Sequence, residues 1–212
     1  MEKIGLYFGS FNPIHNGHLM IANYCIEHYK LDKLIFIVTP QNPFKVNKEL
    51  APFQNRFEMV NVAIDKHPKM EVSDIEINFP TEHYTVDVLD FILENKVFCE
   101  FKDKDVMYHM IIGLDNWIQF NKWKDYEKII GMKDKLQIDV VPRLGYSGIE
   151  PFDTFWEITE KIAKDANVDY VTNSPLTILS STFIRSEIKE GRSVMFYTPC
   201  ELQEYLWIYN NK

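Results

Sequence analysis

Short apolar runs alternate with amphipathic stretches along most of the chain, and this alternation constrains the fold more than any other feature. The runs predicted as strands are KIGLYF (3–8), KLIFIV (33–38), MYHMII (107–112), LQIDVV (136–141) and VDYV (168–171). The stretches with helical spacing of apolar residues are 17–29, 52–64, 84–95 and 152–166. Strands separated by helices form βαβ units, whose right-handed crossovers build a doubly wound parallel sheet. We therefore expect an α/β fold of this class.

Two further helices are expected near the C-terminus, at about 181–190 and 199–208. For the last helix, Thr198 as N-cap, Pro199 at the first helical position and Glu201 at the third predict a capping box. Residues from about 175 to 212 would form a small helical part of a single domain spanning 1–212, because no Gly- or Ser-rich linker divides the chain.

Composition narrows the classes of partner. The chain has 23 Lys and Arg against 31 Asp and Glu, a net charge of −8. This argues against nucleic acid, which needs a basic face, although a local cluster of donors can still bind a small anion. The three cysteines are scattered along the chain and form no CxxC pair. No apolar run is as long as the roughly eighteen residues that a membrane-spanning helix needs. We expect a cytoplasmic protein without membrane partners; the oligomeric state, monomer or homo-oligomer, is not fixed by the sequence.

The stretch GSFNPIHNGHL (9–19) lies directly after the first predicted strand and before the first predicted helix. Open parallel sheets bind ligands beyond the carboxyl ends of their strands, and a helix N-terminus attracts anions. His18 falls in the first helical turn, while Gly9 and Gly17 let the backbone approach a ligand without an intervening Cβ. This arrangement suits a phosphate.

His15 and His18 could also play different parts, and this stretch alone does not decide between them. It is neither a Walker A loop nor a GxGxxG motif. A zinc site would need further ligands, and the sequence has neither HExxH nor clustered cysteines. In a purely structural alternative, His18 caps the helix and His15 is a loop residue.

A second element, LSSTFIRSEIKEG (179–191), has the same character. Ser180, Ser181 and Thr182 precede a predicted helix, and Arg185 lies one turn into it. Hydroxyls, N–H groups at a helix start and a guanidinium form an oxyanion receptor. Taken alone, an ordinary Ser/Thr N-cap beside a solvated arginine is the simpler interpretation. Two such sites in one chain fit a polyphosphate held from both ends.

Together, GSFNPIHNGH and SSTFIR resemble the motifs of the HxGH and ISSTxIR nucleotidyltransferases. Across nearly the whole chain the sequence is similar to the bacterial nicotinate-nucleotide adenylyltransferases. The further supporting stretches, in family order, are TPQNPFK (39–45), YTVDVL (84–89), IIGLDNWIQFNKW (111–123), PRLGY (142–146) and YTPCELQEYL (197–206).

The resemblance implies that the adenylyl group of ATP passes to nicotinate mononucleotide. The products are nicotinate adenine dinucleotide and pyrophosphate, and Mg²⁺ accompanies ATP rather than a protein-held metal site. The acceptor phosphate attacks directly in line, so neither a covalent intermediate nor a general base is required. Positioning and electrostatic stabilisation then carry the catalysis.

Four catalytic residues are implied by the matching motifs: His15, His18, Lys45 and Arg185. His18 would contact the α-phosphate and His15 the remaining phosphates, with Lys45 on the reacting phosphates. Further ATP contacts are implied for Gly9, Ser10, Phe11, Gly113, Asp115, Ser181 and Thr182. Ser181 and Thr182 would hold the β- and γ-phosphates with Arg185, and Gly113 and Asp115 would meet the adenosine. Alternatively, Asp115 caps the helix that follows it.

For the acceptor nucleotide the resemblance implies contacts from Tyr84, Thr85, Trp123 and Arg143. Trp123 would stack on the pyridine ring and Arg143 would bind the phosphate. Their structural alternatives are core positions for Tyr84 and Trp123, an N-cap role for Thr85 and a surface charge at Arg143. Core or surface packing is expected for Trp117, Phe120 and Trp156.

The chain departs from the family pattern at 42–45, where Asn-Pro-Phe-Lys replaces the frequent Pro-Pro-His-Lys or Pro-Pro-His-Arg. Phe44 cannot donate a hydrogen bond, so only Lys45 carries over. Two rival functions remain: another adenylyl or cytidylyl transferase of the same fold, such as the pantetheine-phosphate type, and a catalytically silent nucleotide sensor.

Overall fold

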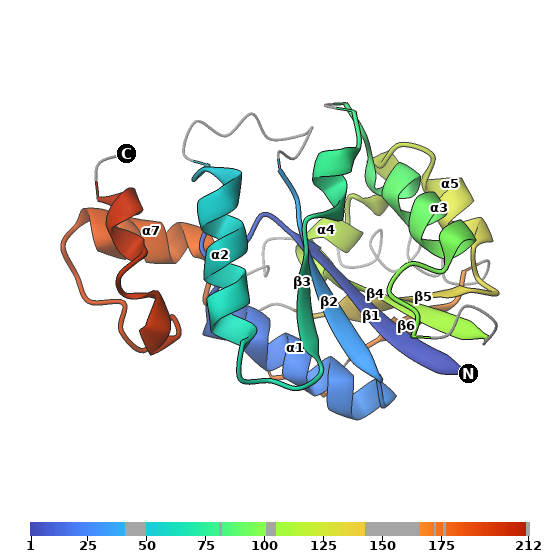
Figure 1. Ribbon diagram of the computed structural model, residues 1–212, viewed down its shortest axis with the longest axis horizontal. Coiled ribbons are helices and arrows are strands. Elements are labelled where there is room, and N and C mark those ends of the chain that lie inside the picture. Colours follow the sequence, from blue (N-terminus) through green and yellow to red (C-terminus); the bar gives the residue numbers. More distant parts are fainter. Residues whose placement is uncertain are drawn as a thin grey trace.

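The computed structural model describes residues 1–40, 50–80, 82–100, 105–142, 166–171, 173–175 and 177–210. Within these ranges six strands form one sheet in the order β3-β2-β1-β4-β5-β6, and every neighbouring pair is parallel (Figure 1). The strands are β1 (Glu2–Gly9), β2 (Lys33–Val38), β3 (Met70–Ser73), β4 (Val106–Gly113), β5 (Leu136–Val141) and β6 (Val168–Tyr170). The expected doubly wound parallel sheet is confirmed.

All five predicted strands are present, and β2 and β5 have the predicted bounds. β3 was not predicted, because its four residues, MEVS, include only two apolar ones. The α-helices in the described ranges are α1 (Asn16–Tyr29), α2 (Phe53–Ile64), α3 (Thr85–Asn95), α4 (Leu114–Trp117), α5 (Tyr126–Gly131) and α7 (Ser181–Lys189). Four of them match predicted helices closely, whereas the short α4 and α5 were missed. The helix predicted over 152–166 falls almost wholly outside the described residues.

The direction in which the sheet grows reverses at β1. β1 pairs with β2 along one edge and with β4 along the other, so the first half of the chain extends the sheet one way and the second half the other way. Crossovers leave β1 and β4 toward opposite faces at this point. A crevice therefore opens between the carboxyl ends of these two strands, and such crevices are where doubly wound sheets bind ligands.

Helices cover both faces of the sheet (Figure 1). α1 and α2 pack on one face, and α3 and α5 on the other. Burial along β2 alternates accordingly, with Leu34 and Phe36 facing α1 and α2 and with Ile35 and Ile37 facing the other layer. Strands covered on both sides are apolar throughout, which explains why β2 was so readily predicted.

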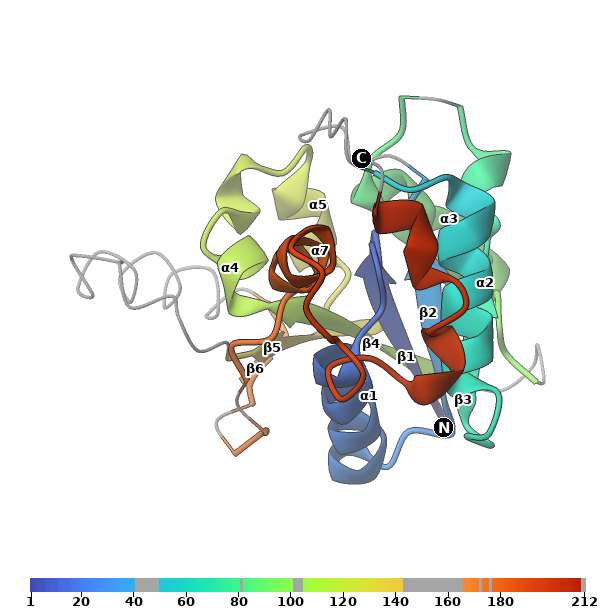
Figure 2. The ribbon, with the colours of Figure 1, turned by 90° about the vertical axis from the view of Figure 1, so that its left-hand side faces the viewer.

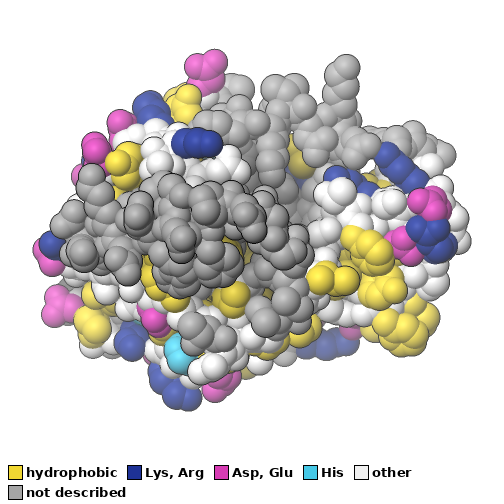
Figure 3. All heavy atoms as spheres, turned by 180° about the vertical axis from the view of Figure 1, so that it is seen from behind, with side chains coloured by type: hydrophobic (Ala, Val, Ile, Leu, Met, Phe, Trp, Pro, Cys, Tyr) yellow, Lys and Arg dark blue, Asp and Glu magenta, His cyan; other side chains and the backbone are white. Residues whose placement is uncertain are grey.

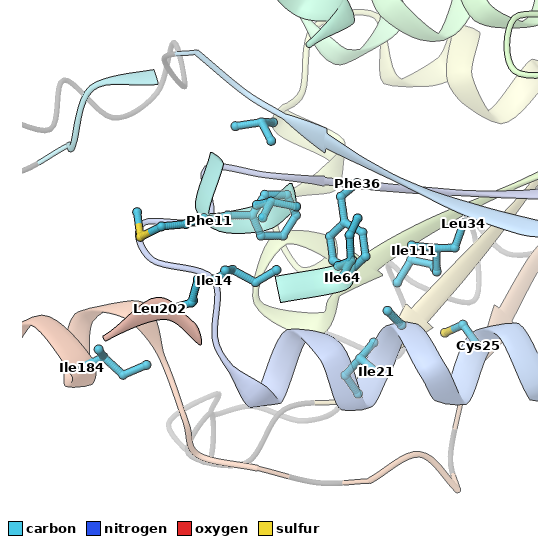
Figure 4. Close-up of a cluster of buried hydrophobic side chains, with 14 of the residues drawn as sticks. Phe11, Ile14, Ile21, Cys25, Leu34, Phe36, Ile64, Ile111, Ile184 and Leu202 are labelled. Atoms are coloured by element: carbon cyan, nitrogen blue, oxygen red, sulfur yellow. The ribbon is translucent and has the colours of Figure 1, made fainter. Parts of the chain in front are cut away.

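The core beneath α1 and α2 also anchors the loop that follows β1 (Figure 4). Phe11 and Ile14 of this loop are at most 2% exposed and pack with Phe36 of β2. Ile184 of α7 and Leu202 belong to the same cluster. Burying each of these side chains contributes about 1.5–3 kcal/mol. The loop is therefore fixed from below, and its polar groups face the crevice.

The C-terminal segment lies across the carboxyl ends of the strands (Figures 1 and 2). Beyond α7 it contains two short 3₁₀ turns, η3 (Cys200–Leu202) and η4 (Leu206–Tyr209); two more, η1 (Ile75–Asn78) and η2 (Phe120–Lys122), lie earlier in the chain. The single helix and capping box predicted at 199–208 are wrong. The hydroxyl of Thr198 donates back to the carbonyl of Val194 (3.3 Å), and Glu201 forms an ion pair with Lys66 (2.6 Å), so neither caps a helix.

Hydrophobic side chains gather on the surface at the end of the molecule where α7 and the C-terminus lie, on the right in Figure 3. Exposed apolar residues of this segment include Phe183, Met195 and Phe196. None of the helices in the described ranges is long and apolar enough to cross a membrane.

Candidate active site

The crevice at the switch point is a cleft of about 540 Å³. Its walls come from the ends of β1 and β4, the starts of α1, α3 and α7, and the segment between α4 and α5. The predicted site residues that line it are Gly9, Ser10, Phe11, His15, His18, Tyr84, Thr85, Gly113, Asp115, Trp123, Ser181, Thr182 and Arg185. Sequence positions nearly two hundred residues apart therefore face one cavity. Lys45, Arg143 and Trp156 lie outside the described residues.

The two histidines form the start of α1. His15 is the N-cap residue, and its Nδ1 accepts from the backbone N–H of His18 (3.4 Å). In return, Nδ1 of His18 accepts from the N–H of His15 (3.3 Å), and the two rings stack with centroids 3.7 Å apart. The structural alternative had the positions reversed: His15 caps, and His18 lies inside the first turn as predicted. Helix capping and cleft lining are combined in the same pair.

The glycines of this motif make room for neighbouring protein side chains. A Cβ on Gly9 would lie 2.8 Å from the Phe11 ring, which folds back because Phe11 has a left-handed backbone (φ 43°). A Cβ on Gly17 would lie 3.0 Å from Nδ1 of His15. Both glycines also line the cleft, so the expectation that they let the backbone approach a ligand stays a prediction. In addition, they allow Phe11 and His15 to take their positions.

The start of α7 is bonded directly to the loop after β1. Ser181 donates its hydroxyl to the carbonyl of Pro13 (2.9 Å), and Nη1 of Arg185 donates to the carbonyl of Asn12 (2.8 Å). Nη2 of Arg185 reaches Oγ1 of Thr182 at 3.5 Å, and Ser180 is the N-cap, accepting from the N–H of Phe183 (3.1 Å). The two candidate anion sites are thus parts of one site. Because the Ser181 proton is committed to Pro13, its hydroxyl can only accept.

Asn12 joins three elements at this site. Its Oδ1 accepts from the N–H of Ala51, before α2, at 3.0 Å and from the hydroxyl of Tyr209 at 2.9 Å. Its own carbonyl accepts from Arg185, as described above. This residue, which sequence reasoning did not single out, holds α2 and the C-terminal segment through its side chain and α7 through its backbone carbonyl.

Gly113 and Asp115 stand at the end of β4. Gly113 is the N-cap of α4, and Asp115 lies in the first turn of that helix. Asp115 is therefore not the cap residue, which removes the structural alternative proposed for it. Its carboxylate borders the cleft close to Gly113.

The far end of the cleft is formed by the start of α3. Tyr84 is the N-cap residue, Thr85 is the first helical residue, and the N–H of Tyr84 donates to Oδ2 of Asp87 (2.9 Å). Nζ of Lys124 lies 4.5 Å from the centroid of the Tyr84 ring. Trp123 is half-buried and packs on Phe120, with ring centroids 5.3 Å apart. Tyr84 and Trp123 therefore serve the core and the cleft together.

Comparison with known proteins identifies the family. The family model described as "Cytidylyltransferase-like" matches residues 6–187. A protein of Cytophaga hutchinsonii named "Probable nicotinate-nucleotide adenylyltransferase" is 38% identical over 204 residues, 96% of this chain and 95% of the relative. One of Bacteroides fragilis with the same name is 37% identical over 195 residues, 92% of this chain and 86% of the relative. The chain belongs to the nicotinate-nucleotide adenylyltransferase family.

Solved adenylyltransferases share the fold. Nicotinic acid mononucleotide adenylyltransferase of Plasmodium falciparum, solved complexed with NaAD, superposes with a TM-score of 0.73 at 18% identity, covering 100% of this chain and 97% of that one. The same protein complexed with APC also gives a TM-score of 0.73, at 19% identity and with the same coverage.

Two aromatic residues were expected to pack in the core or on the surface rather than to bind a ligand. The structure agrees, since Trp117 and Phe120 are at most 2% exposed and belong to the core.

Two features of this adenylyltransferase were missed from the sequence. The first is Arg56 of α2, which is fully buried and donates to four backbone carbonyls: Ala51 (2.9 Å), Ser10 (2.6 Å), Thr39 (2.8 Å) and Pro40 (2.7 Å). Burial lowers the pKa of its guanidinium to about 10, so it is charged at neutral pH. The sequence did contain a signal for this role, because Arg56 lies on the apolar stripe of the helix predicted over 52–64.

The second is a buried pair, Glu76 and His83, which lines the cleft beside the start of α3. Nε2 of His83 lies 3.2 Å from Oε2 of Glu76. Burial raises the pKa of the Glu76 carboxyl. Glu76 lies in a 3₁₀ turn and His83 in a loop, so no periodic pattern distinguished either residue.

Proposed function

We propose that the chain transfers the adenylyl group of ATP to nicotinate mononucleotide, releasing pyrophosphate and forming nicotinate adenine dinucleotide in NAD biosynthesis. The observation that carries this proposal is the direct bonding of α7 to the loop after β1, which makes the two motifs one receptor. A receptor of that extent suits a triphosphate. Family membership and the names of the relatives support adenylyl transfer as the reaction.

At the phosphate end, His18 contacts the α-phosphate and His15 the phosphates beside it. Arg185, Thr182 and the first N–H groups of α7 receive the β- and γ-phosphates, because helix geometry leaves those groups without intrahelical partners. Gly9, Ser10 and Phe11 form the wall behind the triphosphate. We keep Lys45 as a further contact on the reacting phosphates.

At the nucleoside end, Gly113 and Asp115 hold the adenosine, with the carboxylate on the ribose hydroxyls. The acceptor lies toward α3: Trp123 stacks on the pyridine ring, Thr85 and Tyr84 meet the ring substituent, and Arg143 binds the phosphate. The acceptor phosphate is already a nucleophile, so the site needs no base. Alignment of two bound reactants lowers the barrier by up to about 7–11 kcal/mol in favourable cases.

A divalent cation accompanies ATP in nucleotidyltransferases generally, and we propose Mg²⁺. The described residues contain no group of three or more His, Cys, Asp or Glu side chains that could hold a metal ion. The phosphate end instead carries imidazoles, hydroxyls and a guanidinium, which bind phosphate oxygens. These donors fit a cation that would enter on the triphosphate, where it would neutralise charge on the pyrophosphate leaving group.

Pyrophosphate release from ATP and Mg²⁺ with a panel of acceptors tests the proposal. Turnover with nicotinate mononucleotide, and formation of nicotinate adenine dinucleotide seen by chromatography, is the expected result. Turnover with pantetheine phosphate and with no other acceptor of the panel would reassign the acceptor. Tight ATP binding without turnover of any acceptor would identify a nucleotide sensor instead.

A further inference from the structure

Glu76 and His83 form a titratable pair in the wall of the cleft, and the proposed mechanism uses neither. Their side chains are only 5% and 10% exposed, respectively. Glu76 comes from η1 after β3, and His83 immediately precedes Tyr84, the N-cap of α3. The pair therefore stands beside the place assigned to the ring of the acceptor nucleotide.

The hydrogen bonds of His83 fix how many protons the pair holds. Nδ1 of His83 lies 2.8 Å from the carbonyl oxygen of Pro80, and because a carbonyl only accepts, Nδ1 carries a hydrogen. The contact between Nε2 and Oε2 of Glu76, at 3.2 Å, is then favourable only with one more proton between them. Imidazolium with carboxylate and imidazole with carboxylic acid are the two arrangements. Both have zero net charge.

The surroundings of the pair act on this proton in opposite directions, and burial is the largest effect. Thr39, at the end of β2, donates its hydroxyl to the other oxygen, Oε1 of Glu76 (3.3 Å), and the Phe79 ring packs on His83 with centroids 5.4 Å apart. Arg56 of α2 is the cation that acts on Glu76, and like the Thr39 hydroxyl it stabilises the ionised carboxylate. Burial raises the pKa of the Glu76 carboxyl, which opposes an unprotonated pair.

The charged groups on the acceptor side come from two further elements. Lys124, between η2 and α5, lies over the Tyr84 ring, and Asp87 of α3 receives the N–H of Tyr84. Neither is hydrogen-bonded to the pair among the contacts of the described residues. When the pair loses its proton, this wall of the cleft gains one negative charge.

We propose that the Glu76–His83 pair is a specificity-determining element of the acceptor site, which admits a ring carboxylate while it keeps its shared proton. This inference rests on the proposed function, because it takes the acceptor to be a pyridine mononucleotide. With the proton present, the wall beside α3 is neutral and the helix N-terminus dominates. With the proton lost, the wall repels a carboxylate but not a carboxamide.

The test compares nicotinate mononucleotide with its nicotinamide analogue at about pH 7 and about pH 9. Dissociation constants from calorimetry and kcat/KM values are measured for both. Because both ligands carry the same phosphate, its titration cancels in their ratio. We expect the preference for the carboxylate to fall by about fivefold or more at the higher pH, as for one unit charge in a partly screened site.

Two substitutions should move this preference in opposite directions. In Glu76→Gln the amide N–H can still donate to Nε2 and no carboxylate remains, so the preference persists at about pH 9. In His83→Gln the amide satisfies the ionised carboxylate without a shared proton, so the preference is already reduced at about pH 7. A purely structural pair would give losses in the same direction for both variants. Glu82→Gln, which removes a neighbouring exposed carboxylate, is the matched control and should behave as wild type.

If wild type prefers nicotinate mononucleotide to the same degree at both pH values, the inference is overturned. It is also overturned if the Glu76→Gln variant loses this preference at the higher pH as wild type does. The wild-type comparison decides even where a variant does not fold. Binding of both mononucleotides with a constant ratio overturns this inference alone. Failure to bind or turn over either mononucleotide overturns the proposed function as well.

Discussion

The stacked imidazoles of His15 and His18 combine two tasks, because one ring caps α1 and the other lies beside it in the cleft. Replacing His18 by alanine removes the side chain that we propose as a donor to the α-phosphate. We expect kcat to fall on the order of 10²–10³-fold, with ATP affinity largely kept. His28→Ala, an exposed histidine at the other end of α1, is the control. Steady-state kinetics and ATP titration measure both, and a normal kcat for His18→Ala would remove it from the mechanism.

Arg185 connects α7 to Asn12 and borders the phosphate end of the cleft. Arg185→Ala should weaken ATP binding and, in the reverse reaction, pyrophosphate binding, by about 10-fold or more, since a hydrogen bond to a charged group contributes roughly 1.5–3 kcal/mol. The KM for the mononucleotide should change little. Substrate-saturation curves for each reactant make the comparison, with the exposed Lys189→Ala as control. A selective rise in the mononucleotide KM would show that α7 faces the acceptor.

The outcome at single residues shows what a sequence can reveal about a site. Motifs that combine several chemical groups, such as HNGH and SSTFIR, were found because each group is unusual in its setting. Asn12 and Arg56 were not found, because they depend on partners that are distant in sequence. The Glu76–His83 pair was not found, because a 3₁₀ turn and a loop carry no periodic pattern. Asn12 meets Tyr209, and Arg56 meets the carbonyls of two separate loops. Only the folded chain brings these groups together.

Among the elements, α2 has the most demanding packing, because it carries Arg56 into the interior. Arg56→Met introduces an apolar side chain of comparable length but leaves four buried carbonyls without their donor. Since an unsatisfied buried group costs about 1–3 kcal/mol, we expect the free energy of unfolding to fall by at least about 2 kcal/mol. Urea denaturation measures this, and Arg192→Met, at an exposed arginine, should be near neutral. Equal stability of both variants would contradict the assigned role.

The start of α3 predicts a preference between acceptors. The N–H groups of Thr85 and Val86 lie at the helix N-terminus, where a carboxylate is favoured over a carboxamide. Asp87 already takes the N–H of Tyr84, which leaves these two as the groups for the ligand. We expect kcat/KM for nicotinate mononucleotide to exceed that for its nicotinamide analogue at least about tenfold at neutral pH. Equal kcat/KM values for the two mononucleotides, measured at the same Mg²⁺ and ATP concentrations, would contradict this account. Trp123→Ala should lower kcat/KM for both mononucleotides without reversing the preference.

Length decides which elements a sequence pattern can predict. α1, α2 and α3 extend over enough turns for apolar spacing to appear, whereas α4, with four residues, spans about one turn. At 199–208 the pattern of Thr, Pro and Glu predicted a helix, but side-chain bonds to Val194 and Lys66 are formed instead. Local capping signals were outweighed there by contacts made in the folded chain.

For the whole molecule, a buried polar network on β4 and β5 links stability to pH. Asp139 of β5 is fully buried and lies 3.0 Å from Nδ1 of His109, and Gln137 donates to its other oxygen (2.8 Å). Burial raises the pKa of the Asp139 carboxyl above its unfolded value of about 3.9. The folded state therefore binds the proton more tightly, and this contribution to stability is lost as pH rises through the folded pKa.

Asp139→Asn tests this linkage. Between about pH 4 and pH 7, the free energy of unfolding of wild type should fall relative to that of the variant. Denaturation curves at a series of pH values give the difference, and Asp134→Asn, an exposed carboxylate, supplies the control. A difference that is constant or rises with pH would contradict the assignment.

The bonds of Asn12 have a further consequence during synthesis of the chain. Asn12 leaves the ribosome 173 residues before Arg185 and 197 residues before Tyr209, the partners that complete its surroundings. The strands of the first half can pair early, yet the loop after β1 gains these two bonds only after Arg185 and Tyr209 have emerged. A chain cut short before Tyr209, by a premature stop codon or a protease, lacks the bond that fixes the loop from that side. The loop after β1 is thus among the last parts of the described fold to gain its full set of bonds.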